Sequence, residues 1–202
     1  MDVQVEAVYR NSYLNIISAL FKKLGLPQLI DHLVPVDPQC QTRASDIVKL
    51  IVLDILSGRQ ALVHLEQWAH DIDLPKLIRP GLEPSWFNDD AIARHLDRLY
   101  EANIHQVLSS CLVQIYKKEG LSLRVFQRRV RQFITPEHPL KGAGGRKLTR
   151  PTGQAIFQLF WYVRVVLLEL PDGCIQRSLD RSLTPDQRRI LQGLGMDENI
   201  YV

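Results

Sequence analysis

The sequence predicts a mainly α fold, with an N-terminal helical domain followed by a small tail of helix, β-hairpin and helix. Three observations support this prediction. Residues 45–58 form an apolar run that begins at a serine and ends at a glycine. Other segments before residue 120 repeat apolar residues every three or four positions, which is the period of an amphipathic helix. Beyond residue 160, two short β-type segments flank a Pro-Asp-Gly turn at 171–173.

The apolar run from Ser45 to Gly58 predicts the central helix of the fold. The Ser45 hydroxyl can accept an unpaired N–H of the first turn, and Gly58 tolerates the backbone conformation that ends many helices. Because nearly every position between them is apolar, we expect other helices to surround this one. A membrane span needs about 20 apolar residues, and Lys49 and Asp54 interrupt a run that is already shorter. The run therefore indicates a core helix of a soluble domain.

The remaining segments of the first part also predict helices, and none between 11 and 120 has a convincing strand pattern. Asn88 or Asp89 can cap the helix that begins there, and Gly120 can end the last one. We therefore predict an all-helical N-terminal domain over residues 1–122. Its other expected helices cover residues 11–24, 27–33, 62–69, 74–78, 88–103 and 105–119.

The second part changes in character. We predict a basic helix at 126–133, and a loop at 135–149 because that stretch contains two prolines and three glycines. Thr184 can cap a final helix that begins with Pro185. The predicted division is therefore a connector at 123–149 and a small α/β tail at 150–202. Within the tail we expect a helix at 152–161, strands at 163–170 and 174–179, and a helix from 184 to about 194.

Composition excludes several classes of function. The three cysteines, Cys40, Cys111 and Cys174, lie far apart and lack CxxC spacing, which argues against a disulfide framework or a zinc site. Residues 1–8 are acidic and lack the apolar run of a secretory signal. We therefore expect a cytoplasmic protein with no metal, no cofactor, no small-molecule substrate and no membrane partner.

The net charge of +3 conceals a strong asymmetry along the chain. Residues 1–122 carry 12 basic and 15 acidic residues, whereas residues 123–202 carry 13 basic and 7 acidic ones. Between 124 and 150, eight basic residues are opposed by Glu137 alone. Such a segment can contact phosphates, because Lys and Arg displace the counterions of a polyanion; a solvated linker is an equally good interpretation. The candidate DNA-binding residues are Arg128, Arg129, Arg131, Lys141, Arg146, Lys147 and Arg150.

Asp89, Asp90 and Asp97 form the one acidic cluster that could be considered for metal-dependent cleavage of DNA. That chemistry needs several carboxylates that converge on two divalent ions. Asp90 and Asp97 are seven residues apart with Arg94 between them, so we interpret them as members of an exposed ion-pair ladder on a helix. We therefore expect no catalytic residue in this chain.

Two kinds of titratable residue receive a structural interpretation. Asp54 falls on the apolar side of the central helix, so we expect a buried carboxylate whose partner is Arg59 or the N-terminus of another helix. The six histidines show neither HxxxH nor HExxH spacing. We therefore expect each histidine to be a surface or packing residue.

Several segments resemble bacterial insertion-sequence transposases with a DDE catalytic domain. In the first part these are LGLPQLIDHLVPVD (24–37), IVLDILSGRQALVHLEQW (51–68) and FNDDAIARHLDRLYEA (87–102). In the second part they are FQRRVRQFI (126–134), RPTGQAIFQLF (150–160) and LTPDQRRILQGLG (183–195). In that family an RNase H-like domain with the catalytic acidic triad lies between the two sets. Here GLSLRVF (120–126) continues directly into Gln127-Arg128-Arg129, so the resemblance implies an internal deletion near 124–127.

The resemblance thus implies a transposase-related protein of an insertion sequence that is catalytically inactive and retains DNA binding. Two alternatives remain. The chain could be a protein-interaction module that forms a homodimer, or a heterodimer with intact transposase that inhibits the latter. It could also be a decayed open reading frame without a selected function.

Overall fold

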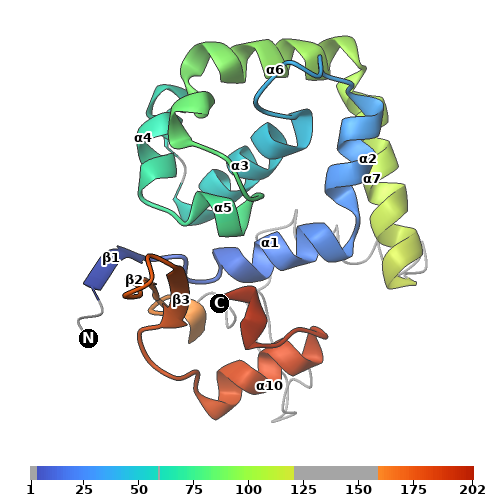
Figure 1. The fold of residues 1–202 in the computed structure, drawn as a ribbon. Helices are drawn as coiled ribbons and strands as arrows, with labels where there is room; N and C mark the ends of the chain where they lie inside the picture. The colour runs from blue at the N-terminus through green and yellow to red at the C-terminus, as the bar shows by residue number, and fades with distance from the viewer. Residues whose placement is uncertain (1–3, 59, 121–158) are drawn as a thin grey trace.

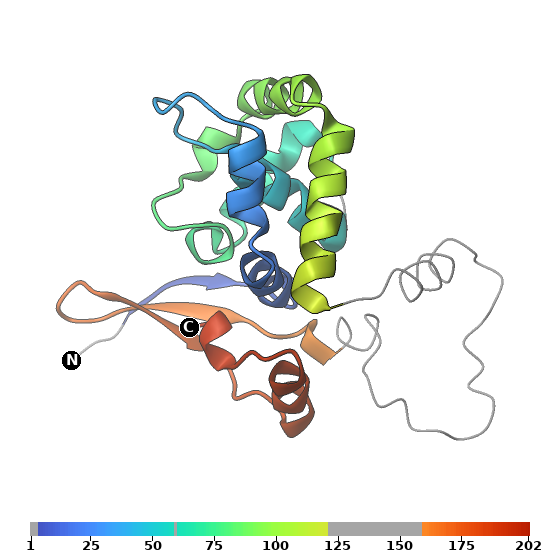
Figure 2. The same cartoon turned by 90° about the vertical axis from the view of Figure 1, so that its right-hand side faces the viewer.

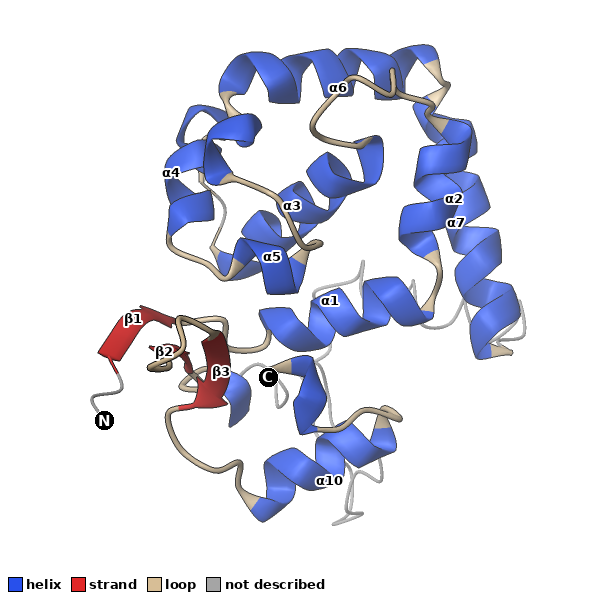
Figure 3. Ribbon diagram, viewed as in Figure 1, coloured by secondary structure: helices blue, strands red, loops and turns tan. Residues whose placement is uncertain are grey.

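The computed structural model of the 202-residue chain describes residues 4–58, 60–120 and 159–202. Helices account for most of this structure, and one small antiparallel sheet accompanies them (Figure 1, Figure 3). The mainly α prediction is therefore confirmed. None of the described helices combines the length and the apolar character that crossing a bilayer requires.

The described helices of the first part follow the predicted order. They are α1 (Leu14–Lys23), α2 (Leu26–Leu33), α3 (Ala44–Ser57), α4 (Leu65–His70), α5 (Leu74–Leu77), α6 (Asp89–Glu101) and α7 (Ile104–Glu119), with 3-10 helices η1 (Leu62–His64) and η2 (Pro84–Phe87). The second part contains the predicted hairpin and final helix. These are β2 (Val165–Glu169), β3 (Ile175–Leu179) and α10 (Pro185–Gly193), followed by the 3-10 helix η3 (Glu198–Ile200).

The sequence does not predict the strand β1 (Gln4–Tyr9) at the start of the chain. It pairs antiparallel with β2, with Gln4 opposite Glu169 and Tyr9 opposite Val165, and an irregularity between Val5 and Ala7. The sheet order is β1-β2-β3. A lone strand whose partner lies about 160 residues further along the chain gives no hairpin signal in the sequence. The hairpin of the tail is thereby extended by the first residues of the chain.

Helix α3 is the centre of the first part, as predicted, but its beginning differs. Arg43, not Ser45, is the N-cap, and its backbone N–H donates to the Asp46 carboxylate at 2.9 Å. Ser45 lies inside the first turn, where its N–H donates to the Asp31 carboxylate at 2.9 Å. A carboxylate of α2 and one within α3 thus replace the cap that the local sequence suggests. Gly58 ends the helix with φ of 127°, as predicted.

The tail shares its core with the helical part. Phe160, Leu191 and Tyr201 are buried in the same cluster as Leu14 and Ile16 of α1. Helix α1 lies between the other helices of the first part and the tail (Figure 1, Figure 2). A second buried cluster joins α2, the start of α3, α6 and α7. The predicted boundaries near 122 and 150 fall outside the described residues, and they stay predictions.

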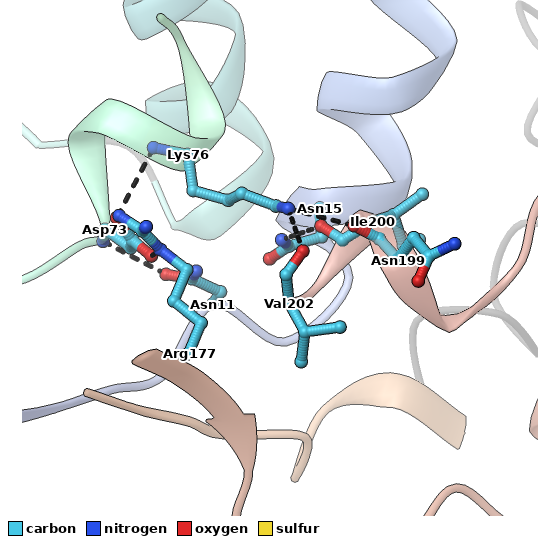
Figure 4. A network of polar contacts seen from close by, with 8 residues as sticks. All are labelled: Asn11, Asn15, Asp73, Lys76, Arg177, Asn199, Ile200 and Val202. Atoms are coloured by element: carbon cyan, nitrogen blue, oxygen red, sulfur yellow. Dashed lines mark hydrogen bonds and ion pairs between the residues drawn. The ribbon is translucent and has the colours of Figure 1, made fainter. Parts of the chain in front are cut away.

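A buried ion pair fastens the tail to the helical part (Figure 4). Asp73, just before α5, is 1% exposed, and it accepts two hydrogen bonds from Arg177 of β3, at 2.6 and 2.9 Å. Its backbone N–H donates to the side chain of Asn11 at 3.2 Å. The contact therefore joins three segments: the stretch before α1, the stretch before α5, and β3. Bidentate pairing of this kind fixes geometry as well as charge.

Helix α5 also holds the last residues of the tail (Figure 4). The ammonium group of Lys76 donates to the backbone oxygens of Asn199, at 2.9 Å, and of Val202. The side chain of Asn15 in α1 donates to the backbone oxygen of Ile200. The hydroxyl of the buried Tyr201 donates to the backbone oxygen of Ser12 at 3.0 Å. These contacts fix the segment after α10 against α1 and α5.

Lys49 of α3 is buried inside the helical part, with 2% of its surface exposed. Its ammonium group lies 5.9 Å from the centroid of the Phe21 ring, and it has no hydrogen-bond partner among the described residues. Burial, together with the positive charge of Lys22, lowers the pKa of Lys49 to about 7, while Asp46 opposes that shift. Burial thus disfavours the charged form of Lys49, which begins to lose its proton near neutral pH.

Truncation of α3 should show which of its faces lies in the core. Leu50→Ala should lower the free energy of unfolding by about 2–5 kcal/mol, because Leu50 is fully buried and its loss leaves a cavity. Ile51→Ala is the matched control, since Ile51 lies on the same helix but is only partly buried. Urea unfolding of both variants measures the difference, and an equal loss in the two would contradict this placement of the core.

Lys49→Met should change the pH dependence of stability. Between about pH 7 and pH 9.5 the unfolded chain holds a proton on Lys49 that the folded chain has lost, because the folded pKa is about 7 and the ordinary value is 10.5. Stability of the native sequence should therefore rise with pH in this window, by at most about 1.4 kcal/mol per unit.

A methionine side chain does not titrate, so urea unfolding of the Lys49→Met variant at pH 7, 8 and 9 should lack this rise, and the variant should be the more stable protein at pH 7. Identical slopes in the two proteins would show that Lys49 keeps an ordinary pKa in the folded state.

Removing Arg177 should weaken the attachment of the tail. Arg177→Met leaves the buried Asp73 carboxylate without its partner and should cost about 3 kcal/mol, as breaking a buried pair does. Arg188→Met is the matched control, because the pair of Arg188 with Glu198 has the same 2.6 Å distance but is exposed on both sides, and it should cost under about 1 kcal/mol. Thermal and urea unfolding would measure both, and equal losses would contradict a special role of Asp73.

Candidate functional site

The residues predicted to contact DNA lie outside the part of the chain that the structure describes. Their assignment therefore stays a prediction, and it rests on charge alone. The same holds for the basic helix predicted at 126–133 and the loop predicted at 135–149. The residues concerned are Arg128, Arg129, Arg131, Lys141, Arg146, Lys147 and Arg150.

The acidic cluster considered for metal binding lies on the surface of α6. Asp89, Asp90 and Asp97 are all exposed, and Asn88 is the N-cap, with its side chain accepting from Ala91 at 2.9 Å. The expected ladder is wrong, because no ion pair joins Arg94 to either neighbouring aspartate in the described structure. Among the described residues, no three His, Cys, Asp or Glu side chains gather as a metal site requires.

Asp54 is buried as expected, and its described partner lies in the turn after α3. Its carboxylate accepts from the backbone N–H of Gln60 at 2.9 Å, so it stabilises the turn that follows α3. The predicted partner Arg59 lies outside the described residues. Asp54 therefore has a structural role in this fold.

One concave site is lined by a basic face of α6. We call it the α6 pocket and define it by Thr42, Trp86, Asn88, Arg94, His95 and Arg98, with further residues of the 39–42 and 85–91 stretches completing its walls. Its volume is about 350 Å³. The pocket lies between the loop that precedes α3 and the N-terminal half of α6. None of the described lining residues is acidic.

The loop wall of the pocket is fixed by a partly buried ion pair. Arg79 pairs with Asp46 in the first turn of α3 at 3.0 Å. The Nη2 of Arg79 also donates to the backbone oxygen of Gln41 at 2.8 Å. Arg98 adds a contact from α6, at 3.8 Å, to the sulfur of Cys40. The loop at 39–42 is therefore held from both sides.

His95 is the buried polar residue of the pocket. Only 2% of its surface is exposed, because it lies on the apolar stripe of α6 with Ile92 and Leu99. Its Nε2 lies 2.9 Å from the Thr42 hydroxyl, while its Nδ1 has no hydrogen-bond partner among the described residues. Burial, and then the charge of Arg98, lowers the pKa of His95. The ring is therefore neutral at pH 7.

This arrangement has the groups of an anion-binding site. It offers two guanidinium groups and a neutral imidazole in a concave setting, which favours a negatively charged ligand. The sequence analysis interpreted His95 only as a surface or packing residue. The useful signal was its position, three residues after Ile92 and four before Leu99, which places a histidine on the buried side of an amphipathic helix.

Comparison with known proteins identifies a family but no characterised relative. Residues 4–113 match a family described as Domain of unknown function (DUF4277). No curated protein and no solved structure matches the chain. The matched region begins at β1, includes every residue that defines the α6 pocket, and ends within α7. Because the match covers more than half of the 202 residues, the chain belongs to the DUF4277 family.

Proposed function

We propose that this protein is a transposase-related DNA-binding protein of an insertion sequence that lacks the catalytic core and does not cut DNA. The DUF4277 domain is commonly seen in transposase-related proteins. The segments that resemble insertion-sequence transposases extend the likeness beyond that domain, to residues 126–134, 150–160 and 183–195.

The observation that carries the DNA-binding proposal is the distribution of charge. Eight of the 25 basic residues lie between 124 and 150, with Glu137 as the one acidic residue there. The preceding 122 residues are net acidic. A polyanion therefore gains favourable contacts at one segment of the chain and is repelled elsewhere.

The packing of the tail is consistent with a deletion between the two ends of a longer protein. Strand β1 and helix α1, from the beginning of the chain, share a sheet and a core with β2 and α10 from its end. Because the two ends of the chain pack on each other directly, this core can form with connecting segments of different lengths between 120 and 159. Domain insertions are tolerated where the flanking elements are held together by contacts of their own.

A second candidate function is self-association through α7. Ile104, Leu108 and Leu112 are spaced four residues apart on this helix and are 50%, 58% and 38% exposed. Because Ile104 and Leu112 are equally far from Leu108, two antiparallel copies of α7 can pack with Leu108 against Leu108. Ile104 of each copy then faces Leu112 of the other. This observation favours the homodimeric interaction module. A stable dimer that does not bind DNA would support it over the first proposal.

DNA binding by the full chain should be strong at low salt and independent of sequence. If four basic groups of the 124–150 segment contact phosphates, log affinity should fall against log salt with a slope of roughly −3 to −4. The triple variant Arg128→Ala, Arg129→Ala, Arg131→Ala should bind every duplex more weakly and with a flatter slope. Fluorescence anisotropy with two unrelated duplexes between about 50 and 200 mM salt measures both effects.

The matched control removes three arginines from the tail, by Arg181→Ala, Arg188→Ala and Arg189→Ala, and should leave the slope nearly unchanged. Two outcomes would overturn the proposal: equal losses in the two triple variants, or tight binding that is insensitive to salt.

A further inference from the structure

The α6 pocket contains positive charge that the surrounding carboxylates do not neutralise. Arg94 and Arg98 are one helical turn apart, and neither forms an ion pair with a carboxylate in the part of the chain that the structure describes. Asp46 lies nearby but is already paired with Arg79 at 3.0 Å. The two guanidinium groups are therefore available to a ligand.

The acidic residues of α6 do not close the pocket. Asp90, Asp97 and Glu101 are exposed and lie within one turn of the two arginines, but none is within ion-pair distance of them in the described structure. Asp90 instead donates its backbone N–H to the carboxylate of Asp89 at 3.0 Å. The carboxylates at the start of the helix therefore engage the first turn, where the helix dipole favours them.

His95 supplies the observation that points to a ligand. Its Nδ1 is buried and lacks a hydrogen-bond partner among the described residues, and a buried polar atom without a partner is costly. A neutral imidazole carries one proton. The Thr42 hydroxyl already bonds Nε2, so Nδ1 is the ring nitrogen that still lacks a partner in the described structure. A negatively charged group beside the ring favours its protonated form.

We infer that the α6 pocket binds a phosphate group, held by Arg94 and Arg98 beside the His95 ring, whether inorganic phosphate, a nucleotide or a nucleic-acid backbone supplies it. Planar guanidinium groups suit phosphate oxygens because each can donate two parallel hydrogen bonds. The volume of about 350 Å³ is at the lower end of ligand sites, which span roughly 300–1,000 Å³. It suits a single phosphate with part of a sugar.

A tryptophan in the pocket lining favours a nucleotide or a single strand over free phosphate. Trp86 of η2 lines the pocket and is partly exposed. An aromatic face beside a phosphate site can stack a base without selecting its identity. This site lies in the helical part and does not use the 124–150 segment, so the inference goes beyond the proposed function and does not depend on it.

Calorimetric titration of the full chain tests the inference with three probes: inorganic phosphate, adenosine monophosphate and a single-stranded dodecanucleotide. Arg94→Gln and Arg98→Gln should each weaken the binding of at least one probe roughly tenfold or more, since each removes charge-assisted hydrogen bonds. Arg94 is exposed, so its variant tests the pocket without a risk to folding. Lys117→Gln and Lys118→Gln remove the same charge from the exposed end of α7 and should change binding less than about twofold.

The three probes distinguish the source of the phosphate. Arginine-dependent binding of the monophosphate assigns a nucleotide, binding of the dodecanucleotide alone assigns a nucleic-acid backbone, and equal binding of all three assigns the phosphate group itself. A readout at His95 is independent of affinity: the bound probe should raise the pKa of His95 in an NMR titration, because the anion stabilises the protonated ring. Binding that is equal in the Arg94, Arg98 and Lys variants would overturn the inference.

The triple variant at Arg128, Arg129 and Arg131 separates this inference from the proposed function. It should lose affinity for duplex DNA while its pocket still binds the probe that the native chain binds. Loss of pocket binding in that variant, with the fold intact by circular dichroism, would show that the basic segment and not the α6 pocket holds the phosphate.

Discussion

The buried Asp73 carboxylate is the constraint on which the arrangement of the two parts depends. A carboxylate that is 1% exposed needs a partner of opposite charge or takes up a proton. Arg177 fills that role from β3, about 100 residues further along the chain. Strand β3 pairs with β2, and the other edge of β2 pairs with β1, which precedes α1 in the chain. The tail is therefore part of the same folded body as the helices.

The helices could be predicted from the sequence because their determinants are local. Apolar spacing and the stops at Gly58 and Gly120 identify α3 and α7 to within a residue or two. Strand β1 could not be predicted, because its pairing with β2 depends on contacts across nearly the whole chain. The start of α3 is a similar case. Ser45 is a good local cap, but the carboxylates of Asp31 and Asp46 satisfy the first N–H groups instead.

The α6 pocket shows the same limit at the level of a site. Its residues come from three stretches, 39–42, 85–88 and 91–98, and none of these has a recognisable motif. The arginines on α6 suggest only an exposed ladder with the aspartates beside them, an arrangement that the fold does not form. What makes the site is the loop carrying Thr42, which Arg79 ties to the first turn of α3 and which contacts α6 through His95. Only the tertiary structure brings that loop to the helix.

The charge distribution indicates that the basic segment at 124–150 and the α6 pocket attract a phosphate over different distances. The first 122 residues are net acidic, so their long-range field opposes the approach of nucleic acid. At physiological salt, charges act over about 8 Å, so Arg94 and Arg98 can attract a phosphate only once it is close to α6. The basic segment at 124–150 has the charge density to attract a polyanion first. Neutralising the segment should therefore slow the association of nucleic acid with the protein. Neutralising the pocket should shorten the residence time of the complex.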